Sequence, residues 1–240
     1  MSPLPFFYKE QFSGAEGSFV LDEVNSKHIV QVLRMKRGER FLLTDGKGRM
    51  ATTSIIHADR KHCVVEVLEQ TITLRATPEV TIAISMLKNT HRMEWFLEKV
   101  TEIGVAKIVL LVCKRTEKEK FRQDRITSIL VSAMLQSRQA WLPQLEPPVR
   151  FQDFIPMQES LNPSGRFIAH CAEGEKRALL PPKEQPSIIL IGPEGDFTPE
   201  EIDLALESGY QPISLGATRL RTETAGIVAA ALLKQSSCTG

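Results

Sequence analysis

The sequence predicts an α/β protein in two parts, a small β-rich domain over residues 1–72 and a larger layered domain over residues 73–240. Short strand-like segments follow one another closely in the first part, which favours a small β-barrel over a helical layer. In the second part apolar strands alternate with amphipathic helices, which indicates a largely parallel sheet covered by helices. The stretch Thr73–Glu79 between them is polar and contains Pro78, so it marks the boundary.

The first part is expected to contain four strands and one helical segment. The helical segment covers Ser26–Leu33, where Ile29, Val30 and Leu33 share one side. The tetrapeptide Asp45–Gly48 has the glycines that a tight turn with positive φ angles requires. The strands are predicted at Phe19–Leu21, Arg40–Thr44, Met50–Ile56 and His62–Leu68.

Helices in the second part are indicated by apolar stripes and capping residues. The helix Arg92–Ile103 carries one apolar stripe and ends at Gly104. Thr198–Glu201 is a capping box with proline at the first helical position, so a helix begins there. The helix Ala225–Lys234 is apolar on most sides and must therefore be buried, in the core or at a dimer interface. A further helix is expected at Asp124–Gln136, and strands at Val80–Met86, Ile108–Val112, Phe167–Cys171, Ile188–Ile191 and Ile213–Leu215.

The composition argues against several kinds of site. The cysteines (Cys63, Cys113, Cys171 and Cys238) share no close spacing, so neither a disulfide framework nor a zinc site is indicated. No pair of histidines has the spacing of metal ligands. No apolar run reaches membrane length, and the first residues do not resemble a signal peptide. We therefore expect a soluble protein of the reducing cytoplasm, with neither a metal nor a membrane partner.

The formal net charge is only +1, but charge is unevenly distributed along the chain. Residues 27–49 include seven Lys or Arg against two acids, and residues 107–125 include seven against three. From residue 150 onward acids outnumber bases, twelve to eight. This asymmetry favours a polyanionic partner for the N-terminal and middle segments, and solvated surface faces are the alternative explanation.

Two glycine-bearing loops near the C-terminus each follow a short apolar strand. The first, Gly192-Pro193-Glu194-Gly195, lies at the carboxyl end of its strand, where open α/β sheets bind ligands. Glycines there let main-chain N–H and C=O groups approach a flat heterocycle closely. A tight turn between strand and helix is the simpler interpretation of this loop by itself. The spacings of phosphate-binding loops are absent.

The second loop, Ser214-Leu215-Gly216, repeats this arrangement one strand later and leads through Arg219 to Leu220-Arg221-Thr222-Glu223-Thr224-Ala225. A threonine cap and a carboxylate at a helix start are ordinary stabilising features. The helix dipole disfavours cations at that end, however. The two arginines therefore indicate a binding site more than they indicate stability.

These two loops closely resemble motifs of the 16S ribosomal RNA uracil-N3 methyltransferases, which belong to the SPOUT class of knotted methyltransferases. The resemblance extends to Arg92-Met93-Glu94, to the segment 99–104 and to the segment 28–34, so it spans nearly the whole chain. Two departures occur. The segment 135–139 replaces the family's Glu-Gln-Ser-Gly-Arg, which leaves Gln136, Ser137 and Arg138 without an assigned role, and Asp196 replaces a usual glycine. The second change is expected to affect only the turn.

The resemblance implies a PUA-like N-terminal barrel that binds RNA and a C-terminal SPOUT domain with a trefoil knot. It also implies S-adenosyl-L-methionine as methyl donor, a homodimer, and methylation of N3 of a specific uridine in the 16S rRNA of the small ribosomal subunit. The strand pattern alone does not predict a knot, because threaded chains are rare.

Main-chain groups of both loops are expected to surround the donor's adenine, with the strand end at His170 as the remaining wall. The predicted cofactor contacts are His170, Leu190, Ile191, Gly192, Pro193, Glu194, Gly195, Ser214, Leu215, Gly216, Leu220, Arg221, Thr222, Thr224 and Ala225. Uracil N3 is a poor nucleophile until its proton leaves, so the site needs a base or a cation that stabilises the uracil anion. Arg221 is the predicted cation. Glu223 and Glu194 are predicted to accept the proton or to orient Arg221, and a helix cap or salt bridge is the alternative for each.

Basic side chains in both parts are the predicted RNA contacts. They are Arg34, Lys36, Arg37 and Arg40 in the first part and Lys88, Arg92 and Lys99 in the second, with Lys47 and Arg49 as further phosphate contacts. Ordinary surface charge is the alternative for each. If they bind RNA, affinity should fall steeply with salt, because each neutralised phosphate releases counterions.

Three other functions remain open at this point. The nearest is a SPOUT methyltransferase that acts on another rRNA position or on tRNA. A non-catalytic ribosome-assembly factor would keep the RNA-binding barrel, but the intact glycines, Arg221 and Glu223 argue against a decayed site. A doubly wound nucleotide-binding oxidoreductase would need an early glycine-rich strand-turn-helix, which this sequence lacks.

Overall fold

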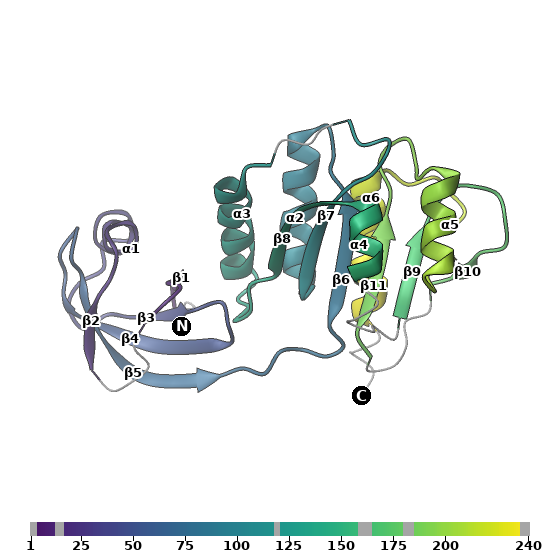
Figure 1. Cartoon of the computed structure of the whole chain (residues 1–240). Helices are drawn as coiled ribbons and strands as arrows, with labels where there is room; N and C mark the ends of the chain where they lie inside the picture. Colours follow the sequence, from purple (N-terminus) through teal and green to yellow (C-terminus); the bar gives the residue numbers. More distant parts are fainter. Residues whose placement is uncertain (1–3, 13–16, 118–120, 158–164, 180–184, 236–240) are drawn as a thin grey trace. The chain divides into compact units, whose positions relative to one another are not determined.

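The computed structural model describes residues 4–12, 17–117, 121–157, 165–179 and 185–235, and the chain forms two compact units (Figure 1). The first unit comprises residues 1–75 and 134–142, and the second comprises residues 76–133 and 143–240. The first unit therefore includes a segment from well beyond the predicted boundary. Cys238 lies outside the described residues.

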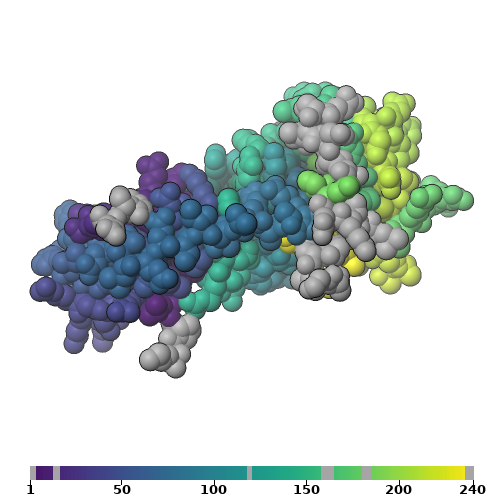
Figure 2. Space-filling view, turned by 90° about the horizontal axis from the view of Figure 1, so that it is seen from below, coloured from purple at the N-terminus to yellow at the C-terminus, as the bar shows by residue number. Residues whose placement is uncertain are grey.

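The first unit is built on a five-stranded sheet in the order β1-β3-β4-β5-β2. Its strands are β1 (Phe6–Tyr8), β2 (Ser18–Val20), β3 (Arg40–Thr44), β4 (Arg49–His57) and β5 (Val64–Ile72). Alternate side chains such as Phe41, Leu43 and Ile55 are buried together with Ile29. The short strand β1, which pairs in parallel with β3, was not predicted. Part of the outer surface of this unit appears in purple and blue in Figure 2.

The helical segment of this unit begins earlier than the predicted Ser26. Helix α1 (Glu23–Lys27) starts after Asp22, whose carboxylate accepts the Asn25 N–H at 2.9 Å. It continues as a π-helical turn, His28–Val32, and the chain then turns at Arg34, a non-glycine residue with φ +56°. The helix therefore ends at a left-handed residue within the segment 28–34.

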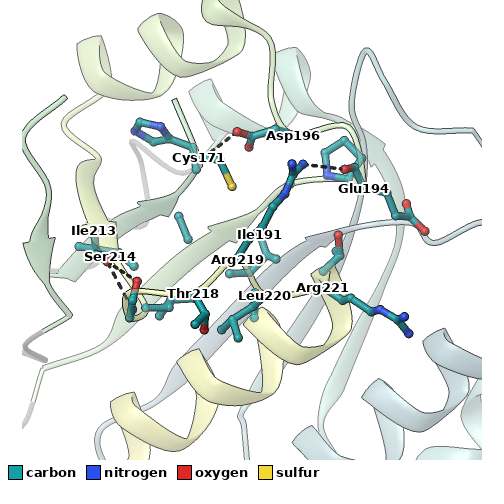
Figure 3. A pocket seen from close by; sticks show the side chains of 18 of the residues that line it. Cys171, Ile191, Glu194, Asp196, Ile213, Ser214, Thr218, Arg219, Leu220 and Arg221 are labelled. Atoms are coloured by element: carbon teal, nitrogen blue, oxygen red, sulfur yellow. Dashed lines mark hydrogen bonds between the residues drawn. The ribbon is translucent and has the colours of Figure 1, made fainter. Parts of the chain in front are cut away.

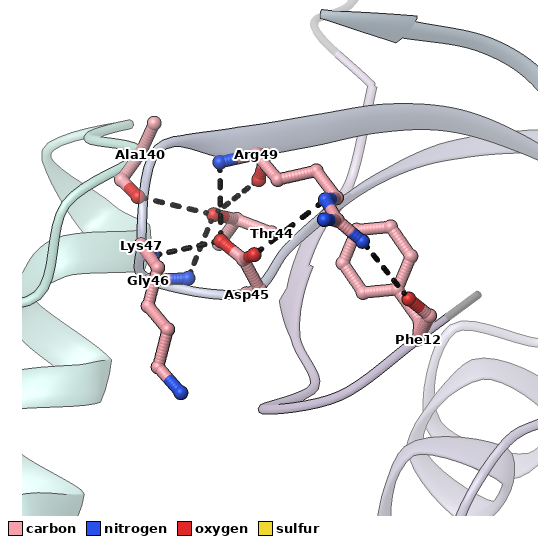
Figure 4. A network of polar contacts seen from close by, with 7 residues as sticks. All are labelled: Phe12, Thr44, Asp45, Gly46, Lys47, Arg49 and Ala140. Carbon is pink, nitrogen blue, oxygen red and sulfur yellow. Dashed lines mark hydrogen bonds and ion pairs between the residues drawn. The ribbon is translucent and has the colours of Figure 1, made fainter. Parts of the chain in front are cut away.

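The turn between β3 and β4 is held by its own polar groups (Figure 4). Asp45 Oδ1 accepts the N–H groups of Lys47 at 2.7 Å and Arg49 at 3.1 Å. Gly46 and Gly48 have φ angles of +69° and +94°, which confirms the predicted need for glycine. The Arg49 guanidinium donates to the Phe12 carbonyl at 3.3 Å and lies 3.8 Å from the Asp45 carboxylate. The Arg49 side chain therefore helps to hold this turn in place.

The departure at residues 135–139 has a conformational explanation. Arg138 has φ +57°, so it occupies the left-handed position for which glycine is the usual residue. Its N–H bonds to the Leu135 carbonyl at 3.1 Å, and its guanidinium donates to the Leu4 carbonyl at 3.0 Å. Arg138 thus takes part in the packing of the first unit.

The second unit is built on a seven-stranded, entirely parallel sheet in the order β10-β12-β9-β11-β6-β7-β8. Its strands are β6 (Val80–Ser85), β7 (Lys107–Val112), β8 (Gln144–Arg150), β9 (Gly165–Ala169), β10 (Arg177–Ala178), β11 (Ser187–Ile191) and β12 (Gln211–Ser214). The parallel sheet confirms the predicted architecture. Strand β8 was missed because Pro147 and Pro148 argue against a strand, but it lies at the sheet edge, where proline is tolerated.

Helices cover both faces of this sheet (Figure 1). They are α2 (Thr90–Ile103), α3 (Gln123–Gln136), α4 (Phe151–Met157), α5 (Pro199–Glu207) and α6 (Thr222–Gln235). Helices α2 and α6 pack together on one face, whereas α4 and α5 share a buried cluster on the other. A Cβ on Gly226 of α6 would lie 2.6 Å from the Phe96 ring of α2, so glycine permits this close approach. No helix in the described part of the chain is long and apolar enough to cross a bilayer.

Candidate active site

A cavity of about 730 Å³ opens at the carboxyl ends of three neighbouring parallel strands, β12, β9 and β11. Its volume is typical of a cofactor or small-molecule site. Residues at the end of each strand and just beyond it line the cavity: 169–171 at the end of β9, 191–194 and 196 at the end of β11, and 213–222 at the end of β12. Arg92, Lys176 and Ala225 complete the lining. The parallel sheet thus brings together the two glycine loops that the sequence singled out.

Most of the predicted cofactor contacts line this cavity. They are His170, Ile191, Gly192, Pro193, Glu194, Ser214, Leu215, Gly216, Leu220, Arg221, Thr222 and Ala225. The other three (Leu190, Gly195 and Thr224) do not line it. The Leu190 side chain is fully buried in the core, because alternate residues of a strand face opposite sides of the sheet.

The first loop is tied firmly to its surroundings. A Cβ on Gly192 would lie 3.1 Å from the ring of Phe197, which is buried. The Arg115 guanidinium, from the segment after β7, donates to the Gly195 carbonyl at 2.7 Å. Asp196 has φ +66°, and its carboxylate accepts the Cys171 N–H at 2.7 Å. The expectation that Asp196 affects only the turn was wrong, because its side chain reaches the neighbouring strand end.

The second loop is held mainly by itself. Ser214 Oγ accepts the Gly216 N–H at 3.3 Å and donates to the Gly216 carbonyl at 3.1 Å. Residues 216–219 are exposed, and Gly216 has φ +131° with no atom within 4 Å of a Cβ built there. This loop therefore needs glycine for its backbone conformation, not for close packing.

The two arginines before α6 point in different directions (Figure 3). Arg219 extends toward the first loop, where its Nη2 lies 3.5 Å from the Glu194 carbonyl. Arg221 extends to the other side of the start of α6, and its carbonyl accepts the Ala225 N–H at 2.8 Å. Both side chains are exposed, as is Glu194. Arg219 thus bridges the two loops, a contact that sequence spacing could not reveal.

Arg92 and Glu223 form an ion pair at the edge of the cavity. Arg92 Nε lies 3.6 Å from Glu223 Oε1, and Glu223 is only 4% exposed. Its other carboxylate oxygen is buried without a hydrogen-bond partner among the described residues. The Arg92 N–H is itself capped by Asn89 Oδ1 at 3.2 Å, which fixes the first turn of α2. Glu223 therefore contacts Arg92, although the sequence suggested Arg221 as its partner.

His170 and Cys171 form the wall after β9. Both ring nitrogens of His170 are buried with no hydrogen-bond partner in the described structure. Burial, followed by the nearby Lys176 cation, lowers the pKa of His170 from its usual value of 6.5. The imidazole is therefore neutral at physiological pH. Cys171 is an exposed free thiol, in contrast to the buried Cys63 and Cys113.

The predicted RNA contacts differ in whether their side chains already form ion pairs within the protein. Arg34, Lys36, Arg37 and Arg40 of the first unit are all exposed. In the second unit, Lys88 Nζ lies 2.6 Å from Glu117, which raises the pKa of Lys88. Lys99 Nζ is held between Glu98 at 2.7 Å and Glu102 at 2.9 Å. Lys99 must leave these carboxylates to reach a phosphate, so it is the weakest of the seven predictions.

The cavity suits a flat, uncharged ring bound through main-chain groups. Gly192 and Gly216 remove side chains from both of its loops, and the apolar side chains of Ile191, Ile213 and Leu220 are available to pack against such a ring. Within the described ranges, no cluster of His, Cys, Asp and Glu is arranged to hold a metal ion. The chain's own residues therefore fit an adenine-containing donor.

Comparisons with known proteins agree with this geometry. The RNA methyltransferase domain family matches residues 75–234, and the RNA methyltransferase PUA domain family matches residues 21–68. Ribosomal RNA small subunit methyltransferase E from Synechocystis is 29% identical, over 90% of this chain and 72% of its own length. The Aquifex aeolicus protein of that name is 26% identical, over 95% of this chain and 97% of its own length.

Solved structures give the same result. A Porphyromonas gingivalis protein described as a probable rRNA-methyltransferase is 37% identical, covers 98% of this chain and 99% of its own, and superimposes with a TM-score of 0.90. The Neisseria gonorrhoeae ribosomal RNA small subunit methyltransferase E, bound to S-adenosyl methionine, is 27% identical over 97% of both chains, with a TM-score of 0.82. With its PUA and methyltransferase domains both matched, the chain belongs to the RNA methyltransferase family.

Proposed function

We propose that this protein methylates N3 of a specific uridine in the 16S rRNA of the small ribosomal subunit, with S-adenosyl-L-methionine as donor. One observation supports this most strongly: two glycine loops, the first followed by Asp196-Phe197 and the second by the Arg221–Ala225 helix start, line one cavity at the carboxyl edge of a parallel sheet. Relatives that align over nearly the whole chain are named ribosomal RNA small subunit methyltransferase E, and one of them binds the same donor.

The proposal includes several finer features of the family. The first unit would be a PUA-like RNA-binding barrel, the second would be a SPOUT domain with a trefoil knot, and the enzyme would act as a cytoplasmic homodimer. The dimer is supported by exposed apolar side chains on the two adjacent helices, Trp95 on α2 (46% exposed) and Leu232 on α6 (36%). The knot and the location rest on the resemblance.

When bound, the donor supplies an electrophilic methyl group on a sulfonium centre. The chain must hold uracil N3 in line with that carbon, since a displacement depends on distance and angle. As the C–N bond forms and the C–S bond breaks, the N3 proton must pass to a base. The exposed Glu194 carboxylate, beside the cavity, is the proposed acceptor.

Two cations at the cavity are proposed to stabilise the uracil anion. Arg221 and Arg92 both line it, and each guanidinium can donate to a uracil carbonyl oxygen. Glu223 is buried beside Arg92, so we assign it the role of holding that guanidinium in place. The contact is an ion pair, and loss of the carboxylate should let Arg92 move.

The first unit is proposed to bind the RNA backbone. Arg34, Lys36, Arg37 and Arg40 lie on one short segment, all exposed, and no ion pair occupies them among the described residues. Four free cations would make binding strongly salt-dependent.

The proposed activity is tested by methyl transfer from labelled donor to small ribosomal subunits that lack the modification. Digestion and mass spectrometry of the product RNA should place one methyl group on N3 of a single uridine. Label in transfer RNA alone, or on another atom or base, would contradict the proposed substrate.

The proposed roles are tested by Arg92→Ala, Arg221→Ala and Glu223→Gln. Each should lower kcat with donor binding retained, and Glu223→Gln should cost less than Arg92→Ala. Near-wild-type turnover by Arg221→Ala would remove Arg221 from the mechanism.

A further inference from the structure

Asp196 adopts a backbone conformation that glycine would satisfy at lower cost. Its φ of +66° lies in the left-handed region, which disfavours side-chain-bearing residues by roughly 1–2 kcal/mol, although less for aspartate than for most. If the loop after β11 needed only a tight turn at this point, glycine would be the better residue. The side chain must therefore contribute something that the turn itself does not require.

The carboxylate of Asp196 makes two hydrogen bonds to main-chain N–H groups. Oδ2 accepts from Cys171 at 2.7 Å (Figure 3), and Oδ1 accepts from Phe197 at 2.9 Å. The bond to Phe197 is local, whereas the bond to Cys171 joins loops from two different strands. Both have an ionised acceptor, which makes them stronger than ordinary hydrogen bonds.

The joined loops leave neighbouring strands at the same level. Strands β9 and β11 pair in parallel up to Ala169 and Ile191, and beyond those residues no ladder hydrogen bond is recorded between them. The Asp196–Cys171 bond continues the connection past the end of the sheet. It lies where the cavity described above begins.

The segment that Asp196 holds has a cavity on each side. His170, Cys171 and Asp196 line both the 730 Å³ cavity and a second one of about 680 Å³, which also touches α5. A wall between two cavities has few packing contacts to hold it. The hydrogen bond that the Asp196 carboxylate accepts from the Cys171 N–H therefore contributes more to the stability of this wall than a bond in a packed core would.

We propose that Asp196 is a positioning residue for the methyl donor, because its carboxylate fixes the Cys171 main chain and so sets the wall of the donor cavity. This inference rests on the proposed function. It also explains the presence of a charged residue at a left-handed position. Asp196 does not take part in methyl transfer itself, so its effect should be on donor binding and not on the chemical step.

The test compares three variants of the full-length protein. Asp196→Gly keeps the left-handed backbone and removes the carboxylate. Asp196→Asn keeps an oxygen acceptor and removes the charge. Asp203→Asn is the matched control, because Asp203 is an exposed residue of α5 that lines only the second cavity.

We expect Asp196→Gly to melt slightly below the wild-type temperature, because relief of the left-handed backbone offsets only part of the loss of two charge-assisted hydrogen bonds. Its Kd for S-adenosylhomocysteine by calorimetry, and its KM for donor, should rise about five- to tenfold, as loss of a charge-assisted hydrogen bond implies. Its kcat at saturating donor and its KM for RNA should be unchanged. Amide exchange at Cys171 should accelerate, Asp196→Asn should be intermediate, and Asp203→Asn should match wild type.

The outcomes separate this inference from the proposed function. A wild-type protein that binds no donor would overturn both. Wild-type binding with an equal Kd for Asp196→Gly would overturn the role of Asp196 alone, as would a loss confined to kcat. If Asp196→Gly does not fold, Asp196→Asn decides: wild-type affinity together with a protected Cys171 amide would reject the charge-assisted bond.

Discussion

The two glycine loops of the donor cavity differ in what holds them. The first, residues 192–197, is fixed to its surroundings by Arg115, by the buried ring of its own Phe197 and by the hydrogen bond that Asp196 accepts from Cys171. The second, residues 214–221, is held largely by Ser214 and is exposed over residues 216–219. Glycine is therefore required for a different structural reason in each loop. In the first loop it avoids a steric clash, and in the second it permits a backbone angle.

This difference makes the first loop a preformed wall and the second a pliable one. A ligand that enters should find the first loop already in place and should order the second. Substitutions in the first loop are then expected to affect folding and binding together, whereas those in the second should affect binding with less effect on stability.

The largest effect is expected from Gly192→Val. Its side chain would press on the Phe197 ring, 3.1 Å from the first added carbon, and overpacking of a buried ring costs about 1–3 kcal/mol. The melting temperature should fall, and calorimetry should detect no donor binding. Gly17→Val is the control, since a Cβ built at Gly17 meets no atom within 4 Å. A Gly192→Val protein that melts and binds like wild type would show that the first loop is not packed as described.

Gly216→Ala should weaken donor binding roughly tenfold, with a smaller loss of melting temperature than Gly192→Val. The added methyl group meets open space, so the cost is backbone strain at φ +131°, about 1–3 kcal/mol. An exposed loop can relax part of that strain. Equal thermal destabilisation by the two variants would contradict the proposed difference between the loops.

Arg115→Ala should raise the donor Kd about fivefold, because the hydrogen bond to the Gly195 carbonyl contributes on the order of 1 kcal/mol. Lys114→Ala is the matched control, since the main-chain N–H of the neighbouring lysine donates to Glu201 of α5 and Lys114 does not line the donor cavity. If both variants bind donor equally well, Arg115 does not fix the first loop.

Thiol labelling compares the wall with the core. Cys171 is exposed at the cavity, whereas burial raises the pKa of Cys113 to about 12 and suppresses its thiolate. Peptide mass spectrometry after treatment with iodoacetamide should find Cys171 modified and Cys113 intact. Bound S-adenosylhomocysteine should protect Cys171. Unchanged labelling in the presence of saturating ligand would argue that the ligand binds elsewhere.

The smallest effect concerns pH. The pKa of His170 is lowered by burial, so the unfolded chain binds a proton more readily than the folded one as pH falls below about 6.5. The free energy of unfolding therefore keeps its full value at neutral pH and decreases on acidification as the unfolded chain takes up this proton. Donor affinity should decline in the same range, and His170→Gln should flatten that decline. Histidine usually titrates between pH 5 and 8. If the His170→Gln profile of donor affinity overlays the wild-type profile in that range, His170 is not part of the donor site.

Local patterns predicted much of this arrangement, and contacts between distant segments supplied the rest. The apolar run 188–191 and the capping box at Thr198 predicted β11 and α5 well, because strand burial and helix capping are encoded over a few residues. The parallel sheet then placed both glycine loops at one edge. By contrast, the Arg92–Glu223 pair joins residues far apart in the chain, and no local pattern marks them as partners.

The missed site residues have the same explanation. Arg115 follows β7 and reaches the first loop only because the strand order places their carboxyl ends at one edge. Asp196 was the one residue with a visible signal, an acid where glycine is usual. From the sequence, this acid predicted only a change in the turn. Its hydrogen bond to Cys171 depends on tertiary structure, which no local pattern indicates.

Hydrogen exchange of the wild-type protein with and without S-adenosylhomocysteine tests the central claim most directly. Main-chain amides of residues 192–197 should already exchange slowly in the free protein, and those of residues 214–222 should exchange quickly and become protected on binding. Strands β4 and β5 of the first unit should not change and serve as an internal reference. Saturating ligand that protects neither loop would contradict the assignment of this cavity to the methyl donor.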